Sequence, residues 1–130
     1  MWGKIKVVGT VTRGTSGSAG LDLYSQEDYK DNGGVVLVST GVRVMIPEGY
    51  VGIIKDRSGM AKKGVTTHGG VIDSDYRGEV GVMLRLNGNT IKKGDRIAQL
   101  VVVPCLMDFE TVDSLDETER GEKGFGSTGN

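Results

Sequence analysis

Residues 79–90 read Glu-Val-Gly-Val-Met-Leu-Arg-Leu-Asn-Gly-Asn-Thr and carry the clearest structural pattern in the chain. Every second position from 80 to 86 holds a large aliphatic side chain: Val80, Val82, Leu84 and Leu86. The positions between them hold Gly81, Met83 and Arg85. This period of two predicts a strand with one buried face and one face that is wet or loosely packed. The Asn87-Gly88-Asn89 sequence that follows predicts a turn.

Short apolar runs of the same kind recur along the chain. The other predicted strands cover residues 4–8, 35–39, 42–46, 50–54 and 96–103. Turn signals separate them: Asn32-Gly33-Gly34, Pro47-Glu48-Gly49 and Lys93-Gly94-Asp95. One short helix is predicted over Ser58–Lys63, with Ser58 as its N-cap and Gly64 at its end. Many short strands joined by turns are typical of an all-β sandwich or barrel.

Composition limits the classes of protein that fit. The 130 residues suffice for one domain, and 22 of them are glycine while only 2 are proline. A net charge of −1 argues against a general nucleic-acid binder, which needs clustered Lys and Arg. One Cys excludes an intramolecular disulfide, and one Cys with one His cannot complete a zinc site. No apolar run approaches the ~20 residues of a membrane span, and the start lacks a signal-peptide pattern. We therefore expect a soluble protein of a reducing compartment, either cytoplasmic or, if eukaryotic or viral, in the nucleus or the interior of a host cell.

The segment Arg120–Asn130 is rich in Gly, Ser and Thr and has no apolar period. Its composition predicts a mobile arm that follows a β domain over residues 1–119. The glycine-spaced hydroxyls, the cations and Phe125 also suit a lid that approaches phosphate and stacks on a planar ring. A plain disordered terminus is the alternative.

Arg57-Ser58-Gly59 stands at the start of the predicted helix. Free backbone N–H groups, the Ser58 hydroxyl and the Arg57 guanidinium suit an anion such as phosphate. An ordinary helix start with a solvated arginine explains the same residues.

Further polar positions stand out in apolar surroundings. Asp73 and Asp75 lie in a predicted hairpin over Gly69–Gly78, and either could act as a general base that activates water. The alternative is that both are simply turn-forming residues. Tyr76, in the same hairpin, either faces a sugar or a base or packs. Asp22 suits a hydrated Mg²⁺ or is a satisfied edge residue. Gln99 interrupts an apolar strand, so its amide needs a backbone or ligand partner if it is buried.

Five segments, in this order, resemble the five motifs of the trimeric dUTP pyrophosphatases (dUTPases). They are Ala19–Leu23, Arg57–Ala61, Gly70–Gly78, Gly94–Leu100 and Arg120–Gly129. The resemblance implies a distorted jelly-roll-like β-barrel with one short helix and a mobile C-terminal arm. It implies Mg²⁺-dependent hydrolysis of dUTP to dUMP and pyrophosphate, which limits uracil incorporation into DNA and supplies dUMP for dTMP synthesis. It also implies a homotrimer in which one chain lends the first, second and fourth motifs to a site, a second chain the third, and the remaining chain its arm.

The resemblance assigns roles to individual residues. Asp73 would be the general base whose water attacks the α-phosphate, and Asp22 would hold Mg²⁺ through a bound water. The phosphate-binding residues would be Arg57, Ser58, Gly59 and Gln99, joined from the arm by Arg120, Gly126, Ser127 and Thr128. The backbone of Gly70, Val71 and Ile72 would read uracil, Phe125 would stack on the base, and Tyr76 would lie against the deoxyribose. Neither nucleic acid nor a membrane is an expected partner.

Three positions depart from the family pattern. Lys123 stands where glycine is common in the arm, and Asp56 stands where a proline or a small residue is common. We expect Asp56 to compete with phosphate for Arg57. Thr67 occupies a place where one branch of the family directs an amide side chain toward uracil, so it is left out of the predicted site.

Other function classes fit the sequence less well. A dCTP deaminase shares the implied fold, but it is longer and has a catalytic glutamate and a different third motif. A regulatory protein on the same scaffold stays open as a second role, although all the catalytic positions are filled. A β-barrel that binds single-stranded nucleic acid needs several exposed aromatics along a basic groove, and only 5% of the residues here are aromatic.

Overall fold

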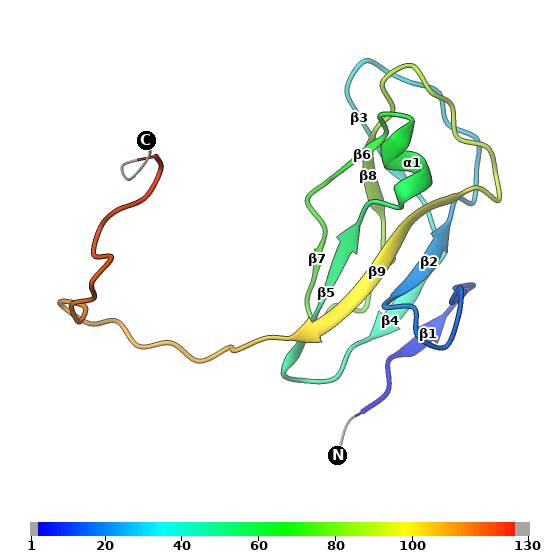
Figure 1. The fold of residues 1–130 in the computed structure, drawn as a ribbon. Helices are drawn as coiled ribbons and strands as arrows, with labels where there is room; N and C mark the ends of the chain where they lie inside the picture. The colour runs from blue at the N-terminus through cyan, green and yellow to red at the C-terminus, as the bar shows by residue number, and fades with distance from the viewer. Residues whose placement is uncertain (1–2, 127–130) are drawn as a thin grey trace.

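The computed structural model describes residues 3–126, which form a nearly all-β molecule with one very short helix (Figure 1). The strands are β1 Lys6–Val8, β2 Gly20–Tyr24, β3 Val35–Val38, β4 Arg43–Met45, β5 Tyr50–Lys55, β6 Thr66–His68, β7 Val71–Ile72, β8 Val82–Arg85 and β9 Arg96–Pro104. Helix α1 covers Ser58–Lys62. The predicted strands are therefore present, with ends that shift by up to three residues, and β2, β6 and β7 are added to them.

The strands form three antiparallel sheets. The largest has the order β2-β9-β5-β7, the second has the order β3-β8-β6, and β1 pairs with β4. Because β9 lies inside the largest sheet, it is paired along both edges, with β2 and with β5. The sheets do not close into a barrel, but the arrangement is jelly-roll-like, as the sequence predicts.

The sheets share one apolar core. The aliphatic side chains of Val80, Val82, Leu84 and Leu86 are at most 1% exposed, whereas Met83 between them is 41% exposed. The predicted alternation is thereby confirmed. The same core includes side chains from β2, β3, β5 and β9 and Val44 of β4, so burial of apolar surface holds the three sheets together.

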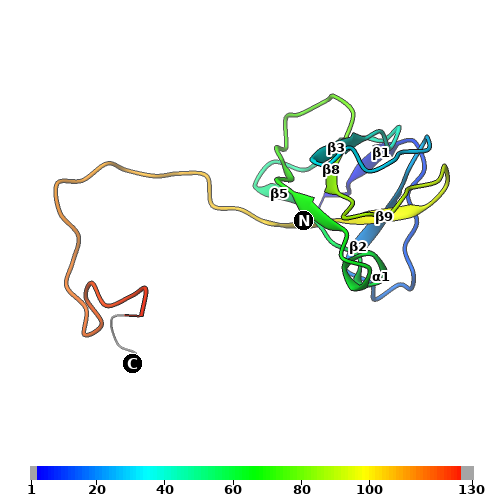
Figure 2. The same cartoon turned by 90° about the horizontal axis from the view of Figure 1, so that it is seen from above.

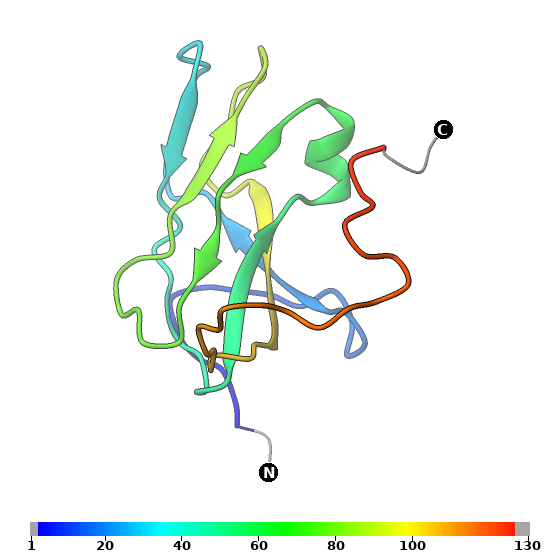
Figure 3. The same ribbon diagram turned by 90° about the vertical axis from the view of Figure 1, so that its left-hand side faces the viewer.

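Helix α1 begins where β5 ends, and the chain then turns back into β6 (Figure 3). Arg57 occupies the N-cap position in an extended conformation, and no side chain caps the helix. The prediction that Ser58 is the cap is therefore wrong, because the carbonyl of Arg57, one residue earlier, already accepts the N–H of Ala61 at 2.9 Å. The other end of the helix is fixed by the turn after β8. There the Asn87 amide donates to the Gly64 carbonyl and the Asn89 amide to the Lys63 carbonyl, at 2.6 and 3.0 Å.

The segment Gly69–Gly78 is not a hairpin of two paired strands. β6 pairs with β8 in one sheet, and β7 pairs with β5 in another, so the chain changes sheets between them. Gly70 makes this change possible with a φ of +111°, which disfavours residues with a side chain. A Cβ at this position would also lie 2.7 Å from Cβ of Ile54. The pattern of local turn signals cannot reveal such a crossover, because the pairing partners are distant in sequence.

After β9 the chain leaves the sheets and runs away from them (Figures 1 and 2). Large apolar side chains on this stretch are almost fully exposed: Leu106 at 91%, Phe109 at 89% and Leu115 at 86%. Side chains of this kind are candidates for contact with another surface. Among residues 3–126, no helix combines the length and the apolar character that crossing a membrane requires.

Candidate active site

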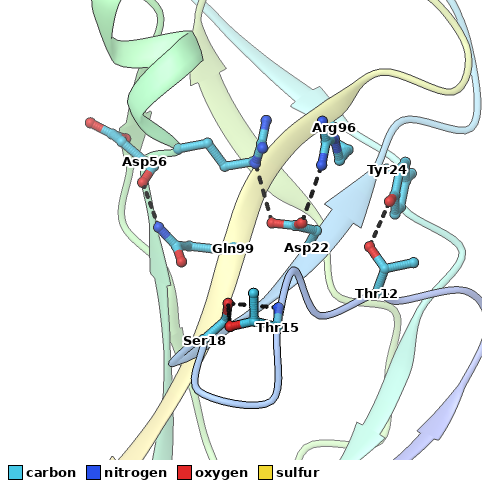
Figure 4. Close-up of polar contacts among 9 residues, drawn as sticks. Thr12, Thr15, Ser18, Asp22, Tyr24, Asp56, Arg96 and Gln99 are labelled. Carbon is cyan, nitrogen blue, oxygen red and sulfur yellow. Dashed lines mark hydrogen bonds and ion pairs between the residues drawn. The ribbon is translucent and has the colours of Figure 1, made fainter.

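A polar cleft of about 380 Å³ lies where β2, β9 and the start of α1 meet (Figure 4). It is lined by Gly14, Ser18, Ala19, Gly20, Asp22, Arg57, Ser58, Arg96 and Gln99. The structure thus brings together the predicted residues Asp22, Arg57, Ser58 and Gln99, which come from three of the quoted motifs. We call this the cationic cleft, because two arginines face one carboxylate in it.

The pairing of β2, β9 and β5 puts Asp22 and Gln99 side by side. Asp22 is the direct partner of Gln99 across the β2–β9 pair, and Gln99 is in turn the partner of Lys55 across the β9–β5 pair. Directly opposite residues of antiparallel strands project from the same face of the sheet. Gln99, the polar residue within the apolar strand β9, therefore lies next to Asp22, and the two side chains together form the floor of the cationic cleft.

Arg96 reaches the same floor because β9 contains a bulge. The register changes between Leu23 and Tyr24, whose partners are Ala98 and Arg96, so Ile97 is the extra residue. Ile97 and Ala98 are both fully buried, although neighbouring strand residues normally point to opposite faces. A bulge re-aims the side chains beyond it, and here it turns Arg96 toward Asp22, with Nη1 and Oδ2 3.8 Å apart.

The Arg57 side chain lies over Asp22. Its Nε donates to Asp22 Oδ1 at 3.2 Å, and the two side chains are 25% and 14% exposed. The Asp22 carboxylate is thus held by two guanidinium groups and is a satisfied acid here, while its role toward Mg²⁺ stays a prediction. Arg57 is not the solvated arginine of the alternative interpretation, because its guanidinium is paired with Asp22.

Asp56 does not pair with Arg57. Its Oδ1 accepts the backbone N–H of Thr67 at 2.9 Å, and its backbone carbonyl accepts the Gln99 amide at 3.0 Å. Asp56 therefore joins the turn before α1 to β6 and β9, and Figure 4 shows its bond to Gln99 of β9. The expected competition with phosphate through Arg57 is not seen. The Gln99 amide has the backbone partner that the sequence analysis required of it.

A second cleft, of about 570 Å³, lies beside β7 and the turn that follows it. Its lining includes the predicted residues Gly70, Val71, Ile72, Asp73 and Tyr76, together with parts of β3 and β8. We call this the turn cleft. The Asp73 side chain is exposed and makes no hydrogen bond or ion pair to another described residue, so its oxygens are available to a water or a ligand.

Tyr76 is held over the turn cleft by bonds at both ends of the residue. Its backbone N–H donates to the Asp73 carbonyl at 3.1 Å, and its hydroxyl donates to the Glu79 carbonyl at 2.7 Å. The ring is 42% exposed, so one part of it is free to contact a ligand.

The two clefts share no lining residue. The chain therefore presents the predicted phosphate-binding residues in one place and the predicted base, sugar and catalytic residues in another.

The predicted arm residues that the structure describes, Arg120, Phe125 and Gly126, lie in neither cleft. Arg120 donates from Nε to the carbonyl of Lys123 at 2.7 Å, and the Phe125 side chain is fully exposed. Gly126 follows in a left-handed conformation, with a φ of +86°. Ser127 and Thr128 lie outside the described residues. The third predicted phosphate ligand of the helix start, Gly59, is exposed in α1 and has open space beside it.

The donor set of the cationic cleft suits only one kind of metal site. Among residues 3–126, no cluster of three or more acidic, His or Cys side chains is present that could hold an ion by itself. A single carboxylate, Asp22, faces the cleft. Mg²⁺ keeps several waters and is commonly bound through one or two carboxylates plus substrate phosphates, so this donor set fits Mg²⁺ that arrives with a phosphorylated ligand.

Arg96 is a site residue that the sequence analysis misses. It stands in the same motif as Gln99, but three residues away, which in a regular strand puts it on the opposite face. One sequence signal could have revealed Arg96. Two consecutive apolar residues, Ile97 and Ala98, follow it, and a β-bulge can place two such neighbours on the same buried side.

Comparisons with known proteins point to one family. The family model for dUTPase matches residues 7–129. A deoxyuridine 5'-triphosphate nucleotidohydrolase of Monkeypox virus is 46% identical over 123 residues, which are 91% of this chain and 82% of that protein. Among solved structures, a G164S mutant of the Staphylococcus bacteriophage 80alpha dUTPase with dUpNHpp superposes with a TM-score of 0.88 at 28% identity. It covers 98% of this chain and 99% of its own. A D95N mutant dUTPase from phage phi11 of S. aureus, described with a structural Mg(II) ion, has a TM-score of 0.77 at 25% identity and covers 86% of this chain and 98% of its own.

The jelly-roll-like β fold carries two clefts, one cationic and one with an available carboxylate, and the relatives of the chain are nucleotidohydrolases. With a family model that matches nearly the whole chain, the protein belongs to the dUTPase family of hydrolases.

Proposed function

We propose that this chain hydrolyses dUTP to dUMP and pyrophosphate, as a homotrimer and with Mg²⁺. The observation that carries this proposal is the division of the predicted site into two clefts on one chain. The relatives support the substrate: the Monkeypox virus protein is named for deoxyuridine 5'-triphosphate, and the 80alpha enzyme was solved with dUpNHpp.

Asp73 is the proposed general base. Its carboxylate is exposed at the turn cleft and is not engaged by another described side chain, which leaves it able to accept a proton. A water that gives its proton to Asp73 forms a new bond from its oxygen to the α-phosphorus. The bond from that phosphorus to the oxygen bridging to the β-phosphate breaks, and pyrophosphate leaves with the electron pair.

The cationic cleft is the proposed phosphate site. Arg57 and Ser58 offer a charged fork and a hydroxyl, and Gly59 adds a backbone N–H without a side chain above it. The bond from Gln99 to the Asp56 carbonyl holds its amide at the cleft floor, where it binds phosphate oxygens. Asp22 would hold a Mg²⁺ ion that arrives with the substrate, and the ion would supply neutralisation of the phosphate charge.

The turn cleft is the proposed site for uracil and deoxyribose. The backbone of Gly70, Val71 and Ile72 lines this cleft and reads the polar edge of the base, and a close fit of the base against this backbone excludes the methyl group of thymine. Tyr76 presents an apolar ring to the sugar, and a 2′-hydroxyl against that ring loses its water without gaining a partner.

The same division supports the proposed homotrimer. A nucleotide triphosphate has to contact both clefts, and they share no residue, so a site completed by neighbouring copies is the arrangement we propose. The exposed apolar side chains after β9 supply a segment that can run along another copy and bring Arg120, Phe125, Gly126, Ser127 and Thr128 over the nucleotide. These residues then bind the terminal phosphates, and Phe125 stacks on uracil. Since deoxynucleoside triphosphates occur inside cells, that is where we propose the enzyme acts.

The experiment that tests the proposal measures pyrophosphate release from dUTP, dCTP, dTTP and UTP in parallel, with Mg²⁺ and with a chelator. We expect fast release from dUTP alone, only with Mg²⁺. Assaying ammonia from dCTP in the same samples tests the deaminase alternative. A folded protein that releases nothing from any of the four nucleotides contradicts the proposal.

A further inference from the structure

The Tyr76 ring packs directly onto Gly78. A Cβ at position 78 would lie 2.5 Å from the Tyr76 hydroxyl oxygen, 2.7 Å from Cζ and 2.9 Å from Cε1. Carbon atoms in contact are separated by about 3.5–4.0 Å, so the ring occupies the volume that any side chain at position 78 would need. Tyr76 therefore lies where it does only because position 78 has no side chain.

The backbone at position 78 gives no separate reason for glycine. Gly78 is not among the glycines with a positive φ, so alanine can adopt its backbone conformation. Outside the neighbouring residues 77 and 79, the three atoms nearest to an added methyl all belong to the Tyr76 side chain. An alanine at this position is thus a steric change aimed at one aromatic side chain.

The turn that carries Tyr76 is held too firmly to move in place of the ring. The Arg77 Nη1 donates to the carbonyls of Ser74 and Tyr76, at 2.7 and 3.2 Å. The Tyr76 N–H is bonded to the Asp73 carbonyl at 3.1 Å. With the backbone of the turn closed by these bonds, the added methyl has to displace the ring.

Glu79, whose carbonyl accepts the hydrogen bond from the Tyr76 hydroxyl, is also held in place. Glu79 accepts the Ser39 hydroxyl and the Gly41 N–H at its Oε2, both at 2.7 Å. The next residue, Val80, donates its N–H to the Val42 carbonyl at 2.7 Å and accepts the Thr40 hydroxyl. The Glu79 carbonyl is therefore a fixed acceptor on the wall of the turn cleft, and it holds the far end of the Tyr76 ring at 2.7 Å.

We propose that Gly78 is a specificity-determining residue: its missing side chain and the Glu79 carbonyl together set the position of the Tyr76 ring, and this position sets the preference for deoxyribose over ribose. The inference rests on the proposed function, in which Tyr76 contacts the sugar. Gly78 acts through Tyr76 and is a positioning residue, not a catalytic one. A displaced ring no longer closes the space beside C2′, and a 2′-hydroxyl is then tolerated.

The test compares Gly78→Ala with Gly34→Ala as the matched control. Gly34 also lacks a positive φ, lies outside both clefts, and an added Cβ there meets nothing closer than 3.7 Å. For each variant, kcat/KM is measured with dUTP and with UTP. We expect Gly78→Ala to lower the dUTP-to-UTP ratio by at least about tenfold, mainly through better use of UTP, because an unpaired hydroxyl is the basis of the discrimination. Gly34→Ala is expected to keep the wild-type ratio.

A second variant covers the case in which Gly78→Ala does not fold. Tyr76→Phe removes only the bond to the Glu79 carbonyl, and we expect it to lower the ratio by about three- to tenfold, the effect of one ordinary hydrogen bond. A folded Gly78→Ala, or a folded Tyr76→Phe, with a ratio within about twofold of wild type overturns the inference, since loss of one hydrogen bond alone should exceed that change.

Binding of dUMP and UMP by calorimetry separates this inference from the proposed reaction. If wild type fails to hydrolyse dUTP but binds dUMP in preference to UMP, and Gly78→Ala reduces that preference, the inference holds although the reaction does not. If wild type shows no preference for the deoxy sugar in either assay, the inference is overturned together with the sugar site.

Discussion

Asp22 and Arg57 are 35 positions apart in the sequence, and their side chains form an ion pair of 3.2 Å between Oδ1 and Nε. The pair joins a strand residue of β2 to the residue that starts α1. Arg96 approaches the other carboxylate oxygen, so Asp22 forms ion pairs with both arginines of the cationic cleft. In the proposed enzyme the same acid also holds Mg²⁺ through water, and its two tasks can be separated experimentally.

Replacing Asp22 with asparagine is expected to affect the use of Mg²⁺ far more than stability. The ion pairs are partly exposed, and such pairs contribute about 0–1 kcal/mol, so the free energy of unfolding should change little. Loss of the carboxylate should raise the Mg²⁺ concentration needed for half-maximal rate by about 10- to 100-fold, as for other groups that support a metal indirectly. Initial rates across a Mg²⁺ titration and urea unfolding measure the two effects. An unchanged titration with lower stability would make Asp22 only the structural partner of the arginines.

Asp73→Asn should abolish turnover while the protein stays folded. The substitution preserves shape but removes the proton acceptor, and loss of a general base typically costs about 10²- to 10⁴-fold in rate. Steady-state kinetics with dUTP and calorimetric binding of dUpNHpp measure the change, and binding should stay close to wild type. Asp75→Asn is the control, because Asp75 is also exposed in this turn but does not line the turn cleft. Near-normal turnover in Asp73→Asn would remove Asp73 from the role.

Local patterns in the sequence predict most of the fold. The alternation at Val80, Val82, Leu84 and Leu86 gives the strand and its buried face, because a period of two has one physical meaning. The exchange of sheets between β6 and β7 is not predictable in this way, since pairing with β8 and β5 depends on residues far away in the chain. The absence of a cap at Ser58 likewise depends on where the helix starts, and that is set by Asp56 and its partners Thr67 and Gln99.

The candidate site is predicted in its residue types but not in its geometry. Asp22, Arg57 and Gln99 stand out as polar residues in apolar or turn contexts, and they do meet in one cleft. The position of Arg96 depends on a bulge at Ile97, which only the register of β2 and β9 reveals. The residue types alone do not separate Gln99 from Asp73 in space. The family resemblance does imply that separation, because it assigns the third motif of a chain to a different site from the first, second and fourth.

Deleting Arg120–Asn130 tests the arm as a functional element. The deletion leaves the exposed apolar residues Leu106, Phe109 and Leu115 in place, so we expect the trimer to persist in light scattering. Turnover should fall by about 100-fold or more, because the arm provides phosphate contacts that act on the transition state. Phe125→Ala should cost less, since stacking on a base is worth about 1–3 kcal/mol. A truncated protein that dissociates to monomers would show instead that the arm is part of the assembly.

Asp31 is expected to make the stability of the fold depend on acidic pH. Its carboxylate accepts the N–H groups of Gly33 and Gly88, at 2.8 and 2.6 Å, and these bonds lower the pKa of Asp31 below its ordinary value of 3.8. A lowered pKa in the folded state stabilises the protein above the unfolded pKa, and the benefit is lost as the pH falls through the folded pKa. Between about pH 5 and pH 3 the melting temperature of wild type should therefore fall more steeply than that of Asp31→Asn, which has no charge to titrate. Parallel curves for the two proteins would contradict this.

Asp56 can influence dUTP binding in two ways, through its negative charge or through its hydrogen bonds, and substitutions distinguish between them. If its charge repels the substrate phosphates, both Asp56→Asn and Asp56→Ala should lower KM for dUTP. The structure instead shows Oδ1 accepting the Thr67 N–H at 2.9 Å, beside the Asp56 carbonyl that holds the Gln99 amide. Asparagine keeps an oxygen acceptor in that place, whereas alanine leaves the N–H without its partner, at a cost of about 1 kcal/mol in stability. We therefore expect Asp56→Ala to raise KM by about three- to tenfold with kcat less affected, and Asp56→Asn to restore the wild-type value. Steady-state kinetics of the two variants at several salt concentrations measures this, and a lower KM in both would support repulsion by the Asp56 charge over positioning of the loop before α1.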